Sequence, residues 1–136
     1  MSNRTSVASI LEAISDDGSL ELFRLVATDG GSTESLRNKV KLTRKQYYSR
    51  LFKLTQTGLV KRKENSYHLT ALGKVVHDCQ ATIASGLANY WKIKAIDSLD
   101  ISDGIPTDEQ KRILELLIKD QDLKKILSKD FRLELH

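Results

Sequence analysis

The chain has 136 residues, with 22 lysines and arginines against 18 aspartates and glutamates, which gives a formal net charge of +4. This length suits one domain of ordinary size, and the low glycine and proline content excludes collagen-like, low-complexity and disordered classes. The single cysteine cannot form an internal disulfide, and no apolar run approaches the roughly 20 residues of a membrane span. We therefore expect a cytoplasmic protein with no membrane partner.

Apolar spacing and capping residues predict four helices in the first half of the chain. Ser6, Ser32 and Thr43 suit the N-cap position, and Gly58 suits the position after a helix where positive φ is required. The predicted helices cover approximately residues 6–14, 20–27, 33–39 and 43–57.

Helical spacing also predicts which side chains are buried. The last of these helices places Tyr47, Leu51 and Leu54 on one face, and we expect Phe52 to pack under the segment that follows. The first helix carries one apolar stripe, formed by Val7, Ile10, Leu11 and Ile14.

After Gly58 the hydrophobic period changes from helical to alternating. Residues 59–63 and 66–70 predict two strands joined by a short turn. A long helix from residue 71 to about residue 96 follows, unless Gly86 kinks or ends it, and Cys79 fits the apolar stripe of this helix as a core residue. Two amphipathic segments, at 108–119 and 122–128, complete the chain.

The positive charge is concentrated in the middle of this pattern. Residues 37–63 contain ten basic side chains and no acidic one, so the stretch carries +10, and the 12 basic and 18 acidic residues elsewhere carry −6. Such a separation of charge usually accompanies a polyanionic partner for the basic part. The alternative is a solvated basic surface that only aids solubility.

The order of short helix, tight turn, helix and hairpin is that of a winged helix-turn-helix. We expect a mostly α-helical fold with a small β-hairpin, consisting of a winged helix-turn-helix and long C-terminal helices. The expected divisions are an N-terminal helix (1–18), a DNA-binding domain (19–76) and a helical dimerisation extension (77–136). Residues 43–57 would enter the major groove of double-stranded DNA, and the wing at 59–70 would lie on the backbone.

Two kinds of DNA contact are expected from the basic stretch. The outward face of the predicted recognition helix supplies the base contacts, from Arg44, Lys45, Tyr48 and Ser49. Other basic side chains would mainly meet phosphates, and these are Arg37, Lys39, Lys41, Arg50, Lys53, Lys61, Arg62 and Lys63.

Two sequence features resemble the core of prokaryotic winged-helix transcriptional regulators. They are the Leu-x-x-Leu-x-x-x-Gly-Leu-Val pattern that ends at Val60 and the wing return from Tyr67 to Lys74. The stretch is most similar to archaeal regulators related to the multiple-antibiotic-resistance and arsenical-resistance repressor families. The resemblance covers about residues 20–76, and it implies binding to double-stranded DNA and, usually, a homodimer.

The long helix offers a surface for self-association. Small residues in its middle allow another helix to approach, and large apolar side chains lie beside them. The expected dimer interface consists of Ile83, Leu87, Tyr90 and Trp91. The alternative is a monomer in which the terminal helices pack within one chain.

Catalysis has no support in the sequence. There is no glycine-rich phosphate loop and no nucleophile–base pair, and His68, His77 and His136 are too far apart to indicate a local metal site. We expect no enzyme activity, no cofactor and no metal, and the sequence identifies no effector ligand. Two other functions remain open, a winged-helix protein-interaction module of transcription or replication machinery and a non-specific architectural DNA binder.

Overall fold

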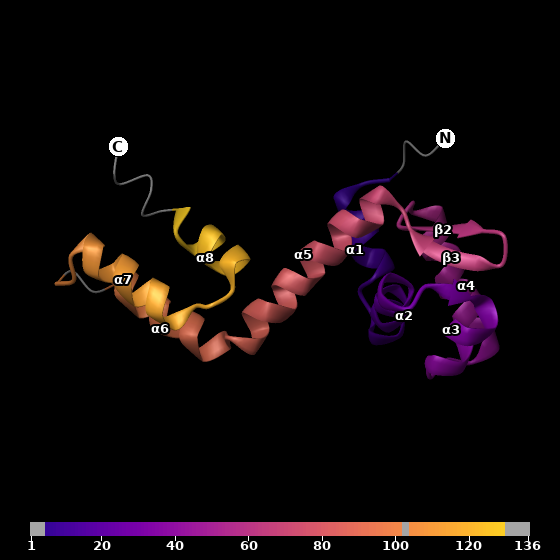
Figure 1. Cartoon of the computed structure of the whole chain (residues 1–136), viewed down its shortest axis with the longest axis horizontal. Coiled ribbons are helices and arrows are strands. Elements are labelled where there is room, and N and C mark those ends of the chain that lie inside the picture. Colours follow the sequence, from indigo (N-terminus) through magenta and orange to yellow (C-terminus); the bar gives the residue numbers. More distant parts are fainter. Residues whose placement is uncertain (1–4, 102–103, 130–136) are drawn as a thin grey trace. The chain divides into compact units, whose positions relative to one another are not determined.

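The computed structural model describes residues 5–101 and 104–129 (Figure 1). The described residues form eight helices and a three-stranded antiparallel sheet, so the fold is mostly helical with a small sheet, as the sequence predicted. The chain divides into two compact units, Met1–Asp78 (unit 1) and Cys79–His136 (unit 2). No helix in the described ranges combines the length and the hydropathy that crossing a bilayer requires.

Unit 1 begins with helices whose caps agree with the sequence signals. Ser6, Ser32 and Thr43 each occupy an N-cap and accept a backbone N–H bond, and Gly58 has a φ of 84°. The elements of unit 1 are α1 (Val7–Ala13), α2 (Asp17–Thr28), β1 (Gly31–Ser32), α3 (Thr33–Lys39), α4 (Arg44–Gln56), β2 (Val60–Lys63), β3 (Ser66–Leu69) and the first part of α5 (Ala71–Ala88).

One hydrophobic core joins all the helices of unit 1. Leu22 and Phe23 of α2 are completely buried, together with Leu36 of α3 and the inner face of α4. Ala13 of α1 belongs to the same core, so the first helix packs as a part of unit 1 and not as a separate segment.

The sheet contains one strand more than the sequence predicted. Its order is β1-β3-β2, with β1 paired antiparallel to β3 through Gly31 and Tyr67. A strand of two residues is too short to show a period of two, which is why only the hairpin of β2 and β3 was predicted.

The start of α5 lies very close to Leu59, the residue directly before β2. A Cβ atom on Gly73 would lie 2.0 Å from the carbonyl oxygen of Leu59, so only glycine fits at this position. Thr70 fixes the entry to the helix, because its hydroxyl donates to the Gly58 carbonyl and accepts the N–H of Gly73.

Some of the predicted burial is wrong. Val7 and Leu11 are exposed, whereas Ile10 and Ile14 pack against the core, because a helix of seven residues presents only part of its stripe to α2 and α4. Phe52 is 65% exposed instead of packed under the hairpin. Cys79 is also exposed, which contradicts its expected place in the core.

The long helix predicted to reach residue 96 ends earlier. It is divided into α5 and α6 (Tyr90–Ile101), and the break falls at Asn89, three residues after Gly86. The Asn89 amide donates to the Ser85 carbonyl at 2.8 Å. A side chain that competes for a helix carbonyl in this way weakens the regular backbone hydrogen bonds of the helix. Gly86, one turn earlier, weakens the helix further because glycine has a low helix propensity.

Unit 2 is a small helical cluster. It continues from the end of α5 through α6 into α7 (Thr107–Leu117) and α8 (Gln121–Leu127), and α7 lies beside both α6 and α8 (Figure 1). Its core consists of Ile96, Leu114, Ile118 and Leu123. Ser85 donates to Asp120 at 2.7 Å and thereby joins the end of α5 to the cap of α8.

Candidate nucleic-acid interface

Helix α4 is fixed at its start and along its inner face. At the start, Thr43 Oγ1 accepts the N–H of Gln46 and Gln46 Oε1 accepts the N–H of Thr43, both at 3.1 Å. Tyr47, Leu51 and Leu54 are buried on the inner face, as predicted. The position of α4 in unit 1 is therefore determined without any contribution from its outer side chains.

Tyr47 anchors α4 to the beginning of α3. Its hydroxyl donates to the Thr33 carbonyl at 3.1 Å, and burial raises its pKa to about 12, with smaller contributions from Tyr67 and Tyr48. The hydroxyl therefore keeps its proton, and its hydrogen bond, at neutral pH. This tyrosine is a core residue, as the sequence predicted.

The outer face of α4 carries the residues that the sequence assigned to base contacts. All of them are exposed, and they are Arg44, Lys45, Tyr48 and Ser49. Phe52 continues this face one turn further along the helix. The result is a surface that combines two cations with two aromatic rings on a rigid helix.

Successive side chains of β2 point to opposite faces of the hairpin, so its three basic residues are divided between the two faces. Arg62 points toward α4, where its guanidinium lies 6.0 Å from the centre of the Tyr67 ring. Together with Tyr48 and Phe52 these two side chains line a shallow groove of about 310 Å³ between α4 and the hairpin.

The other two basic residues of β2 face away from α4. Lys61 and Lys63 line a pocket of about 660 Å³ that also contacts the end of α2 and the start of α5. Lys61 pairs across the hairpin with His68, which lines the same pocket. The hairpin thus presents basic side chains on two opposite faces, whereas the sequence predicted a single DNA-contacting surface.

Three of the predicted phosphate contacts are engaged in ion pairs inside unit 1. Their carboxylate partners all lie outside the basic stretch, which is why counting charge within that stretch missed them. Lys39 pairs with Asp29 at 2.9 Å, Arg50 with Asp16 at 3.3 Å, and Lys53 with Glu12.

These pairs also affect the carboxylates. The hydrogen bond and the charge of Lys53 hold the pKa of Glu12 below its ordinary value. The pKa of Asp16 is lowered mainly by the backbone N–H of Ser19 and less by Arg50. Because Glu12 belongs to α1 and Asp16 caps α2, Arg50 and Lys53 lie on the flank of α4 that faces these two elements.

The remaining predicted phosphate contacts are Arg37, exposed in the last turn of α3, and Lys41, exposed on the connection between α3 and α4. Neither forms a salt bridge with any residue in the described ranges. Together with the start of α4 they form one part of the basic stretch whose charge is not balanced by an ion pair among the described residues, and the basic residues of β2 form another.

Unit 2 carries the residues expected at a dimer interface. All four are exposed, namely Ile83, Leu87, Tyr90 and Trp91, and Trp91 reaches 78%. Tyr90 and Trp91 form an edge-to-face pair with ring centres 5.3 Å apart. Two of the small residues near them make contacts within the chain itself. Ser85 donates a hydrogen bond to Asp120, and Gly86 lies beside Ile93 and Leu123.

The described residues contain no group of three or more His, Cys, Asp or Glu side chains arranged to hold a metal ion. Comparison of the chain with protein-family models, with curated proteins and with solved structures gives no match.

Proposed function

We propose that unit 1 is a winged helix-turn-helix domain that binds double-stranded DNA and regulates transcription. In this proposal α3 and α4 are the helix pair, and the hairpin of β2 and β3 is the wing. The observation that carries it is the outer face of α4, where Arg44, Lys45 and Tyr48 are exposed on a helix whose inner face is fixed in the core.

The chemistry of this face suits the major groove. Arg44 and Lys45, in the first turn of α4, can donate to the O6 and N7 acceptors of guanine. Tyr48 and Phe52 can contact the methyl group of thymine. Arg37 and Lys41 would meet phosphates beside the groove, and Arg62 would meet the backbone or the adjacent minor groove from the wing.

We also propose that the protein acts as a homodimer through unit 2. Single exposed apolar residues are common on protein surfaces, but Ile83 and Leu87 are one helical turn apart and precede the exposed Tyr90 and Trp91. A two-fold dimer would present two copies of α4 to half-sites about 34 Å apart.

Selection of bound duplexes from a random library tests the DNA-binding proposal. We expect enrichment of one sequence with two-fold symmetry, and affinity that falls as salt concentration rises. Binding without enrichment would indicate an architectural role. Failure to bind duplexes at low salt would leave a protein-interaction module, for which the exposed Phe52 and Tyr48 would be the natural contact surface.

Light scattering of the purified chain tests the dimer. A mass near twice 15.4 kDa at micromolar concentration is expected, and a mass near 15.4 kDa would contradict the proposal.

A further inference from the structure

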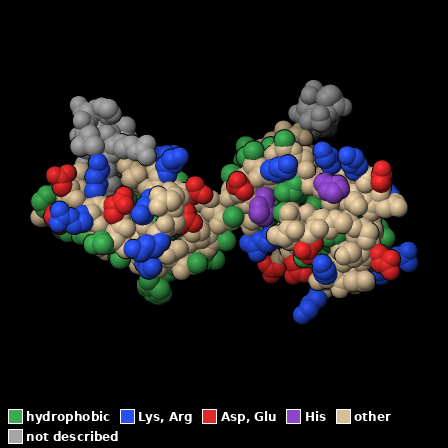
Figure 2. All heavy atoms as spheres, viewed as in Figure 1, with side chains coloured by type: hydrophobic (Ala, Val, Ile, Leu, Met, Phe, Trp, Pro, Cys, Tyr) green, Lys and Arg blue, Asp and Glu red, His purple; other side chains and the backbone are tan. Residues whose placement is uncertain are grey.

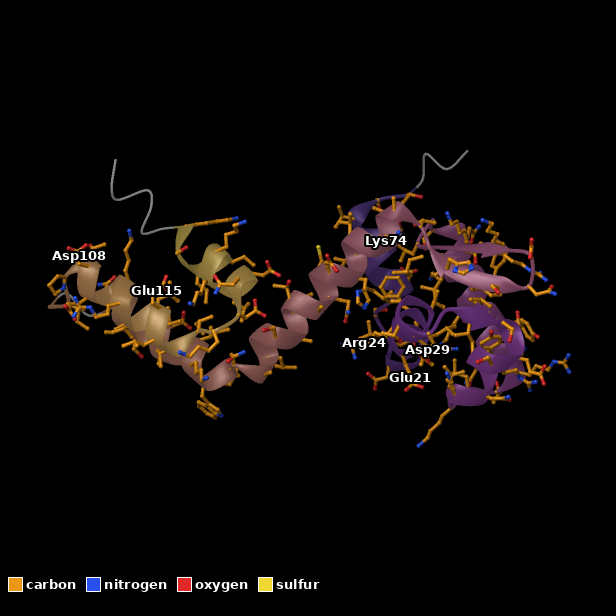
Figure 3. All side chains as sticks on the ribbon, in the orientation of Figure 1. Glu21, Arg24, Asp29, Lys74, Asp108 and Glu115 are labelled. Carbon is orange, nitrogen blue, oxygen red and sulfur yellow. The ribbon has the colours of Figure 1, made fainter. Side chains whose placement is uncertain are left out.

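A pocket of unit 1 lies on the side of the hairpin opposite to α4. It is bounded by the end of α2, by Gly30 and Gly31, by the outer face of the hairpin and by the first turns of α5, and its volume is about 660 Å³. Volumes of this size are typical of small-molecule sites. Lys74 of α5 and Asp29 at the end of α2 are among its lining residues (Figure 3).

Three lysines from two different elements converge on this pocket. Lys61 and Lys63 project from the same face of β2, about 7 Å apart along the strand. Lys74 comes from the first turn of α5, on another side of the pocket. Lys and Arg side chains are visible beside a histidine on this side of unit 1 in Figure 2.

His68 adds a further hydrogen-bond donor to the lysines. It stands opposite Lys61 in the hairpin register, and its Nδ1 lies 3.9 Å from the position that a Cβ on Gly30 would occupy. The imidazole therefore lies over the end of α2, within the pocket that the lysines line.

The pocket contains two acidic residues, Asp29 and Asp78, beside its three lysines, so its lining keeps an excess of positive charge. Asp29 forms its ion pair with Lys39, which does not line the pocket, and Asp78 lies 3.8 Å from His77 Nδ1. None of the three lysines forms a salt bridge with a residue in the described ranges. The pocket therefore presents three ammonium groups that a multiply charged anion can bridge.

We infer that this pocket binds the phosphate groups of a multiply phosphorylated ligand, held by Lys61, Lys63 and Lys74 with His68 as a further donor. The inference does not depend on the DNA-binding proposal, because the pocket and the outer face of α4 use different residues. Phosphate groups have two possible sources here, a small phosphorylated molecule or the backbone of a nucleic acid that reaches around the wing.

Titration of the full chain with inorganic tripolyphosphate at low salt tests the inference. Two pocket variants, Lys63→Gln and Lys74→Gln, are compared with two controls, Arg62→Gln on the opposite face of β2 and Lys45→Gln on α4. All four side chains are exposed, so each variant should keep the thermal unfolding temperature of the parent. Each pocket variant should weaken tripolyphosphate binding about tenfold, and neither control should change it measurably.

A duplex-binding measurement with the same variants distinguishes the two sources. If the ligand is a small molecule, Lys74→Gln leaves duplex affinity unchanged. If nucleic-acid phosphates fill the pocket, Lys74→Gln lowers duplex affinity and tripolyphosphate competes with the duplex. Equal weakening of tripolyphosphate binding by all four variants, or no binding by the parent chain, would overturn the inference. Binding of tripolyphosphate by a chain that binds no duplex would support the pocket while contradicting the proposed DNA-binding function.

Discussion

The two units differ in how many apolar side chains they bury. In unit 1 the buried core contains eleven apolar residues drawn from α1 to β2, while in unit 2 it contains four. Unit 2 also exposes more large apolar side chains than it buries, with Trp91 and Leu87 the most exposed. A small core with uncovered apolar side chains supports the proposed association through unit 2, whereas unit 1 buries more apolar residues than it exposes.

The largest expected effect is the loss of stability caused by a substitution at Gly73 in unit 1. Gly73→Ala places a Cβ 2.0 Å from the Leu59 carbonyl oxygen, and this backbone atom cannot move without disturbing β2. We expect a loss of about 3 kcal/mol in the free energy of unfolding, measured by urea denaturation. An unchanged midpoint would mean that the start of α5 does not pack on Leu59.

The next effect concerns the exposed surface of unit 2. Trp91→Ala should weaken the dimer by about 2 kcal/mol, or roughly thirtyfold in Kd, because a large aromatic side chain at an interface contributes strongly to binding. Sedimentation equilibrium measures the change, with Lys92→Ala as the neighbouring exposed control. If Trp91 is not at the interface, the dimer dissociation constants of both variants will equal that of the parent protein.

Two arginines of α4 distinguish base contact from structural pairing. Arg44→Ala should reduce discrimination at one base pair about tenfold in a selection experiment. Arg50→Ala removes the same charge from the flank that pairs with Asp16, so it should leave the selected sequence unchanged. An equal loss on every sequence for both variants would contradict this division.

Gly86 in unit 2 provides the counterpart of Gly73. A Cβ at Gly86 would meet only Ile93 and Leu123, at 3.8 and 4.0 Å, which are ordinary contact distances. Gly86→Ala should therefore stabilise the protein by about 0.5–1 kcal/mol through helix propensity, as measured by thermal unfolding. A loss of stability would instead reveal that another helix packs closely against this position.

The smallest effect is a pH dependence in unit 2. Asp120 caps α8 and accepts the Ser85 hydroxyl, and this hydrogen bond is the main cause of its lowered pKa. Because the folded pKa lies below the ordinary value of 3.8, the carboxylate stabilises the fold above that pH and this stabilisation is lost as pH falls through the folded pKa. The difference in unfolding temperature between the parent and Asp120→Asn should therefore be present at neutral pH and disappear in acid. A difference that stays the same from neutral pH to strong acid would contradict this assignment.

The sequence predicts those structural features that depend on residues close together in the chain. The cap at Thr43, the glycine at position 58 and the buried face of α4 follow from local spacing, and the structure confirms them. The pairing of Arg50 with Asp16 and of Lys53 with Glu12 joins residues 34 and 41 positions apart. No local pattern contains that information, and the exposure of Phe52 and Cys79 likewise depends on contacts between elements that are distant in the sequence.

The basic stretch is consequently three surfaces and not one. The start of α4 with Arg62 faces one way, Lys61 and Lys63 face the opposite way, and Arg50 with Lys53 is paired toward α1. The total charge of the stretch does not distinguish these surfaces, but the directions in which the side chains point do.

The hairpin makes this distinction depend on chain register. Because neighbouring residues of β2 point to opposite faces, inserting or deleting one residue between Val60 and Lys61 would exchange the side chains offered to α4 and to the pocket. Such a change would leave the composition and charge of the hairpin nearly unaltered. The order of residues along β2, and not their number of charges, therefore decides which side chains reach the groove beside α4 and which reach the pocket.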